Sequence, residues 1–247
     1  MLPVKPPNLK RIPAVSLIAT AVGLTLSIAT QTRINEYRVT NASRSYDFVV
    51  RIQEHSWQGT DEYREGPGKV LIFRKGASKP FQTIDMENIF VSRDKHGQPL
   101  VNAASRYEDQ GMINVGDFNF DGHEDFAVQN GNHGSYGQPS YSVYLYSPKK
   151  SAFVYSKALS SLIEDTLGFF HVDSKNKHLI TFSKSGCCYH ETVEYVVEED
   201  LPVPVSRVVE DATTAPDGFE DVRHEKYVNG KWKGNKKRIA LSPENRK

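Results

Sequence analysis

The chain has 247 residues, and its 31 lysines and arginines nearly balance its 30 aspartates and glutamates, so the formal net charge is +1. This balance excludes a polybasic nucleic-acid-binding protein and an acidic solvating tail. Hydrophobic residues make up 38% and charged residues 25%, which is the composition of a folded chain. With 12 tyrosines, 12 phenylalanines, 17 glycines and 13 prolines, the composition favours strands and turns.

Residues 1–29 have the layout of a secretory signal peptide. Lys5, Lys10 and Arg11 precede an uncharged run, and Ser27 and Ala29 occupy the −3 and −1 positions of a small-residue cleavage site. The alternative is an uncleaved N-terminal anchor, because the run approaches the roughly 20 apolar residues that span a bilayer. In both cases the remainder is expected outside the cytoplasm, periplasmic or secreted, with no membrane span after signal cleavage.

Short β-rich runs separated by turn signals follow along the rest of the chain. The segments expected as strands are 45–53, 69–74, 87–92, 125–129, 140–146, 152–155, 167–172, 178–184, 192–198, 203–209, 222–228 and 237–241. One different pattern, at 157–164, predicts one or two helical turns. About a dozen short strands predict one all-β, antiparallel, propeller-like domain over residues 30–247, with a sandwich or barrel as alternatives.

The segment 117–125 reads DFNFDGHED and predicts a calcium-binding loop between two strands. Oxygen ligands at alternating positions converge when such a loop curls around a glycine, and calcium prefers oxygen ligands. The predicted ligands are Asp117, Asn119, Asp121, the carbonyl of His123, and Asp125, with Gly122 at the sharp turn. An EF-hand is excluded because its final glutamate is replaced by Val128. The alternative is an acidic hairpin turn whose carboxylates face water.

The segment 185–191 reads SGCCYHE and predicts a presented loop. Cys187 and Cys188 are the chain's two cysteines, and a lone pair usually bridges in an oxidising compartment. Adjacent Cα atoms lie about 3.8 Å apart, below the usual disulfide range, so a bridge there would be strained. Tyr189 is suited to enter a partner's cleft, because tyrosine gives a large contact area at low entropic cost. The alternative is a hairpin turn whose tyrosine packs back on the sheet.

The Gly- and Tyr-rich segment 130–146 lacks the pattern of a phosphate-binding loop. It is interpreted as a tight turn beside the acidic loop. In the alternative interpretation, His133 and Tyr136 line a binding face.

Taken in their order along the chain, the segments 117–125, 130–146 and 185–191 resemble the secreted, calcium-binding, propeller-like proteins typified by the immunity protein of an antibacterial type IV secretion system. The resemblance covers roughly residues 110–200. It implies periplasmic inhibition of a peptidoglycan hydrolase. The pattern Ser-Gly-x-x-Tyr is similar to the loop that periplasmic lysozyme inhibitors insert into the catalytic cleft. It implies that Ser185, Gly186 and Tyr189 contact the enzyme.

Three functions therefore compete. The first is a calcium-binding inhibitor or immunity-type protein whose partner is a peptidoglycan hydrolase or lysozyme. The second is a calcium-stabilised module that binds the cell wall or a surface protein without inhibition. The third, an enzyme such as a propeller glycosidase, is disfavoured because no pair of carboxylates is singled out by its spacing. Nucleic acid is not an expected partner, and the oligomeric state is left open.

Overall fold

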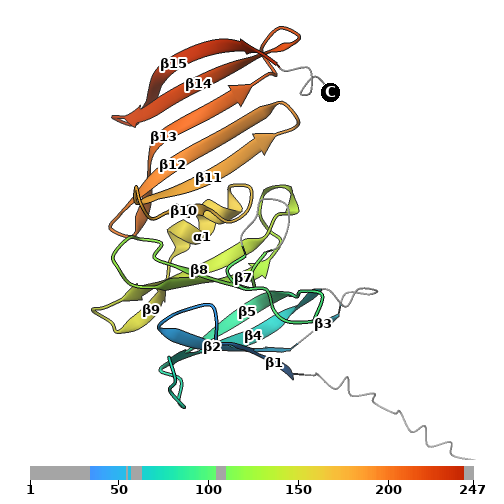
Figure 1. Ribbon diagram of the computed structural model, residues 1–247, viewed down its shortest axis with the longest axis vertical. Helices are drawn as coiled ribbons and strands as arrows, with labels where there is room; N and C mark the ends of the chain where they lie inside the picture. The colour runs from blue at the N-terminus through green and yellow to red at the C-terminus, as the bar shows by residue number, and fades with distance from the viewer. Residues whose placement is uncertain (1–33, 54, 57–62, 104–109, 242–247) are drawn as a thin grey trace, which may run out of the picture. The chain divides into compact units, whose positions relative to one another are not determined.

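The computed structural model describes residues 34–53, 55–56, 63–103 and 110–241. The predicted signal peptide, residues 1–29, lies outside the described residues. All of the described residues belong to one compact unit. Within the described ranges, three antiparallel sheets and one short α-helix make a mostly β fold (Figure 1).

The first sheet has five strands, and its apolar face forms part of a core. Its strands are β1 (Ile34–Val39), β2 (Tyr46–Gln53), β3 (His55–Ser56), β4 (Tyr63–Arg74) and β5 (Gln82–Ser92). The spatial order is β1-β2-β4-β3, and β5 also pairs with β4. Alternate residues of β2, namely Phe48, Val50 and Ile52, are buried, as expected when one face of a strand meets a core.

The second sheet is a four-stranded meander. It consists of β6 (Ile113–Gly116), β7 (Asp125–Gly131), β8 (Ser140–Ser147) and β9 (Ala152–Tyr155). Strand β7 lies between two hydrophobic clusters. Phe126 and Val128 belong to the cluster shared with the first sheet, and Ala127 belongs to the other cluster. Burial on both faces explains why Phe126, Ala127 and Val128 form a continuous apolar run rather than an alternating pattern.

The helix α1 (Lys157–Glu164) packs beside β8 in the second cluster. Its N-terminus is capped by the Ser156 side chain, which accepts a hydrogen bond from the Leu159 amide. Ser160 Oγ also accepts a hydrogen bond from the Val143 amide of β8 at 2.9 Å. Leu159 and Ile163 are fully buried there.

The third sheet has six strands in sequential order. They are β10 (His171–Asp173), β11 (His178–Ser185), β12 (Tyr189–Glu198), β13 (Leu201–Asp211), β14 (Phe219–Val228) and β15 (Lys231–Ala240). Its first strands contribute Leu179, Val172 and Tyr195 to the second cluster. In contrast, most residues of β14 and β15 are exposed or only half-buried.

No closed propeller is formed by the described residues. The sheets have five, six and four strands, and the six-stranded sheet is an open meander with β10 and β15 at its ends. The three antiparallel sheets confirm the predicted antiparallel β structure as a mostly β fold, whereas the propeller-like arrangement is not observed among the described residues. In the part of the chain that is described, no helix is long and apolar enough to cross a membrane.

Candidate functional site

The acidic loop lies between β6 and β7 and curls around its own backbone. Asp117 accepts hydrogen bonds from the amides of Asp121 (3.0 Å) and Gly122 (2.9 Å). Asn119 Oδ1 accepts from the same Asp121 amide at 3.3 Å, and Asp121 Oδ1 accepts from the His123 amide at 2.8 Å. Gly122 has φ = +90°, a conformation that ordinary residues rarely adopt, so glycine suits this turn. The loop thus brings the oxygens of Asp117 and Asn119 to one amide.

Asp125 is the last residue of the acidic segment and lies in the protein interior. Its side chain is fully buried, and its carboxylate accepts hydrogen bonds from the amides of Phe118 and Tyr146, both at 2.8 Å. Burial raises the pKa of Asp125 to about 7, against the effect of these two hydrogen bonds. The neighbouring carboxylates of Asp121 and Asp117 raise this pKa further.

Two acidic residues that the sequence analysis missed connect this loop to the other sheets. Glu124 accepts hydrogen bonds from Ser43 Oγ and from the Arg44 and Ser45 amides, just before β2. Asp200, in the turn between β12 and β13, accepts a hydrogen bond from Asn119 Nδ2 at 2.8 Å. Asp200 lies 81 residues from Asn119 in sequence, and no local pattern marks it as a partner of this loop.

The chemistry of the loop fits a hard cation, because every predicted ligand atom is an oxygen. An oxygen that accepts one amide hydrogen bond keeps a second lone pair for a metal. In the described part of the chain, however, no group of three or more acidic, histidine or cysteine side chains is arranged to hold a metal ion.

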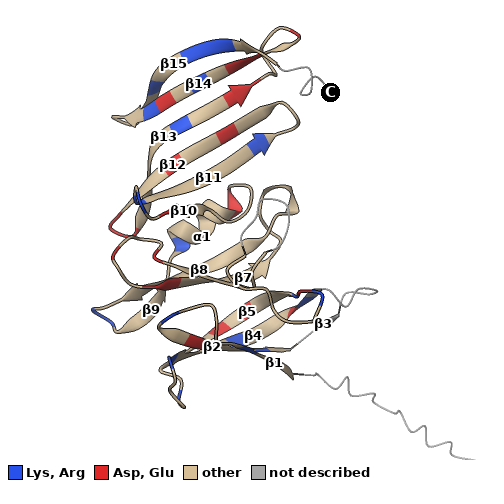
Figure 2. Cartoon of the chain, in the orientation of Figure 1, with Lys and Arg blue, Asp and Glu red and all other residues tan. Residues whose placement is uncertain are grey.

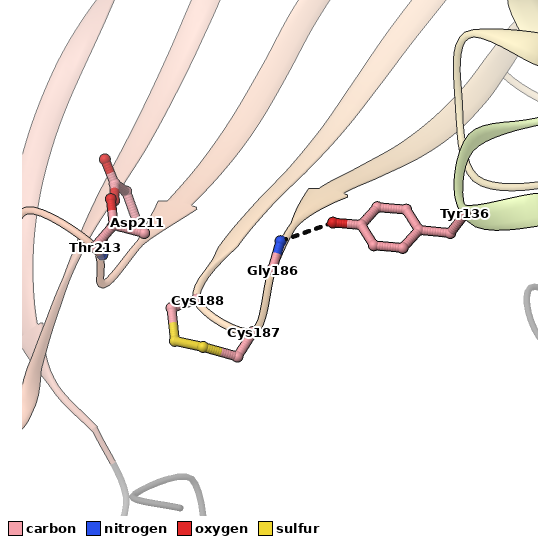
Figure 3. The surroundings of a disulfide bond; sticks show 6 residues. All are labelled: Tyr136, Gly186, Cys187, Cys188, Asp211 and Thr213. Atoms are coloured by element: carbon pink, nitrogen blue, oxygen red, sulfur yellow. Dashed lines mark hydrogen bonds between the residues drawn. A yellow bond between two sulfur atoms is a disulfide. The ribbon is translucent and has the colours of Figure 1, made fainter.

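The Ser-Gly-x-x-Tyr segment is the hairpin between β11 and β12. Ser185 and Tyr189 form the last cross-strand pair, and Gly186–Cys188 is the turn. Gly186 has φ = +64°, a left-handed conformation suited to glycine. Cys187 and Cys188 are joined by a disulfide, with Cα atoms 3.7 Å apart. The bond closes a small ring that includes the peptide bond between them (Figure 3).

The turn is also held by two hydrogen bonds, one at each end. The Gly186 amide donates to Tyr136 Oη at 2.8 Å, and the Cys188 carbonyl accepts from the Ala212 amide at 2.8 Å. Figure 3 shows Tyr136 reaching the turn from a different segment, and Asp211 and Thr213 close by. Asp211 accepts hydrogen bonds from the amide and hydroxyl of Thr213, which orders the neighbouring turn. The hairpin tip is therefore held covalently and from both sides.

The exposed part of this hairpin is its tip rather than its tyrosine. Ser185, Gly186 and Cys187 are exposed, whereas Tyr189 is half-buried. Tyr189 pairs with Asp211 across β12 and β13. Burial raises the pKa of Tyr189, and the Glu191 carboxylate adds to this shift. The ring thus packs along the charged face of the sheet, and the tip is free to contact another molecule.

Comparison with known proteins identifies a structural relative. The chain matches no sequence-family model and no curated protein. It is similar to a solved structure described as a Xanthomonas type IV secretion system related protein, at 24% identity and a TM-score of 0.64. The match covers 83% of this chain and 94% of the other. The two proteins therefore share a fold over most of this chain and nearly all of the other.

Proposed function

We propose that the protein is a periplasmic, immunity-type inhibitor that binds and blocks a peptidoglycan hydrolase of the lysozyme type. The observation that carries the proposal is the exposed tip Ser185–Cys187, which a disulfide and two hydrogen bonds hold in one shape. A pre-ordered tip loses little conformational entropy when it enters a cleft, so more of the contact energy remains as affinity. The fold shared with a protein related to a type IV secretion system supports the proposal, because the sequence resembles the immunity protein of such a system.

The test is inhibition of peptidoglycan hydrolysis by a panel of muramidases, with the mature chain added in increasing amounts. Ser185→Lys places a long charged side chain at the exposed tip and should abolish inhibition without lowering the melting temperature. Tyr189→Ala removes a half-buried ring at the base of the exposed tip and should weaken the complex by about 2 kcal/mol, the scale of an interface hot spot. Tyr155→Ala is the matched control, since Tyr155 is a 51% exposed tyrosine on β9. Equal inhibition by all four proteins would contradict the mechanism.

The proposal includes one structural calcium ion, held by the side chains of Asp117, Asn119, Asp121 and Asp125 and by the carbonyl of His123. The ion would offset the repulsion among three carboxylates and stabilise the folded loop. Calcium at about 100 times its Kd should add about 2.7 kcal/mol to the free energy of unfolding. For a chain of this size, each kcal/mol raises Tm by about 2–4 °C. A chelator should lower Tm, calcium should restore it, and magnesium should restore it less; an unchanged melt would contradict the site.

A second candidate function is a wall- or surface-binding module without inhibitory activity. The observation that favours it is the exposure of Tyr136, 61%, on the Gly- and Tyr-rich loop. Capture of the protein by purified peptidoglycan, together with uninhibited hydrolases, would select this function over the first.

A further inference from the structure

Tyr136 combines an exposed ring with an unusual backbone. The residue is 61% exposed, and its φ is +59°, inside the short 3-10 turn Ser135–Gly137. Residues other than glycine rarely adopt this left-handed conformation, because their Cβ atom crowds the backbone there. Such a conformation persists where the surrounding structure imposes it, and it is frequent at binding sites.

The loop around Tyr136 is held by a chain of hydrogen bonds. The Gly134 amide donates to the Gln138 carbonyl at 2.9 Å, and the Gly137 amide donates to the Gly134 carbonyl at 3.0 Å. The His133 amide donates to Ser140 Oγ at 3.2 Å. Ser140 Oγ in turn donates to Asn130 Oδ1 at 2.6 Å. These bonds anchor the loop to the ends of β7 and β8 and fix the direction of Tyr136.

That direction brings Tyr136 to the hairpin tip of the third sheet. Its Oη accepts the hydrogen bond from the Gly186 amide at 2.8 Å, across 50 residues of sequence (Figure 3). Lys184 Nζ lies 4.9 Å from the centroid of the Tyr136 ring, within the range of a cation–π contact. The tip and the ring are therefore neighbours on the surface, and a basic side chain lies beside them.

We propose that Tyr136 belongs to the hydrolase-binding surface, where its ring and the tip Ser185–Cys187 form one composite patch. Tyr136 contacts the enzyme through its exposed ring and positions the tip through the Oη bond to Gly186. The inference rests on the proposed function. The partner chemistry fits this patch: a glycosidase cleft carries carboxylates, which complement Lys184, and it accommodates sugar rings, whose place a planar phenol can take.

The test compares Tyr136→Phe, which removes only the hydroxyl, with Tyr136→Ala, which removes the ring, and uses Tyr155→Ala as the control. Tyr136→Ala should raise the inhibition constant by about 30-fold, the effect of a hot-spot residue. Tyr136→Phe should have a smaller effect on inhibition and should accelerate amide exchange at Gly186. Tyr155→Ala should change neither quantity.

Chemical footprinting separates contact from a purely structural role. Bound hydrolase should protect Tyr136 from nitration by tetranitromethane and leave Tyr155 reactive. Inhibition by the wild type with no effect of Tyr136→Ala and no protection would overturn the composite patch and leave the proposed function standing. A wild type that binds no hydrolase would overturn both. Unchanged Gly186 exchange in Tyr136→Phe would overturn the positioning role alone.

Discussion

Glu124 shows how one carboxylate can join two parts of the fold. Its oxygens accept hydrogen bonds from Ser43 Oγ at 2.9 Å, the Arg44 amide at 3.1 Å and the Ser45 amide at 3.0 Å. Burial alone would raise the pKa of Glu124, but the hydrogen bonds from Ser45, Arg44 and Ser43 outweigh burial and lower it. The charged form is therefore the one that the fold stabilises.

Glu124→Gln should lower the free energy of unfolding by about 1–3 kcal/mol, because the amide keeps only one acceptor oxygen for three donors. Urea unfolding of the two proteins at neutral pH measures the difference. Glu87→Gln is the control, since Glu87 is an exposed residue of β5. If Glu124→Gln loses no more unfolding free energy than Glu87→Gln, the three hydrogen bonds do not stabilise the fold.

At the scale of elements, the outer strands of the third sheet are stabilised by ion pairs within one layer. Asp221 of β14 is almost fully buried. Its carboxylate oxygens lie 2.6 Å from Lys236 Nζ and 2.8 Å from Arg238 Nε, both on β15. Arg207 of β13 forms ion pairs with two carboxylates: its Nη1 lies 2.8 Å from Glu191 Oε1, and its Nε lies 2.6 Å from Glu225 Oε2. Figure 2 shows basic residues along β15 beside acidic residues on β14. Long charged side chains thus cover positions that a second layer would otherwise bury.

These pairs make the outer strands sensitive to acid. Hydrogen bonds from Arg238 and Lys236 hold the pKa of Asp221 well below its ordinary value. A carboxyl whose pKa is lowered in the folded protein stabilises the fold at pH values above its pKa in the unfolded chain, about 3.9. This contribution is lost as the pH falls below that value. Asp221→Asn should therefore destabilise the protein strongly at pH 6 and progressively less on acidification. Urea unfolding across pH measures this difference, with exposed Asp217→Asn as the control; a pH-independent difference would contradict the assignment.

The sequence predicts elements well where one side of a strand or helix meets a core. The bounds of β9 and α1 match the prediction, because apolar side chains recur there with strand and helix periods. The first half of β15, KWKGNK, was missed because it is mostly exposed and carries no apolar alternation. The segment 167–172 was predicted as a strand, but only His171–Asp173 is one. Leu167 and Phe170 are apolar because they fill the core as part of a loop.

At the scale of the whole molecule, the acidic loop connects all three sheets. It lies in the second sheet, Glu124 reaches the residues before β2 of the first, and Asn119 reaches Asp200 of the third. The sequence marks the loop itself because its oxygen-bearing side chains recur at fixed spacing. It does not mark Ser43, Asp200 or the contact between Tyr136 and Gly186, because these pairings depend on the fold and leave no local pattern.

The contact between Asn119 and Asp200 can be removed without straining the backbone. Glu199 and Asp200 have φ = +52° and +64°, which is the geometry of a tight hairpin turn that glycine tolerates. Asp200→Gly therefore preserves the turn and deletes the acceptor for Asn119, whereas Asp200→Asn retains an acceptor oxygen. Amide exchange at Asp121 and Gly122 should accelerate in Asp200→Gly and stay near wild type in Asp200→Asn. Equal exchange in all three proteins would show that the third sheet does not order the acidic loop.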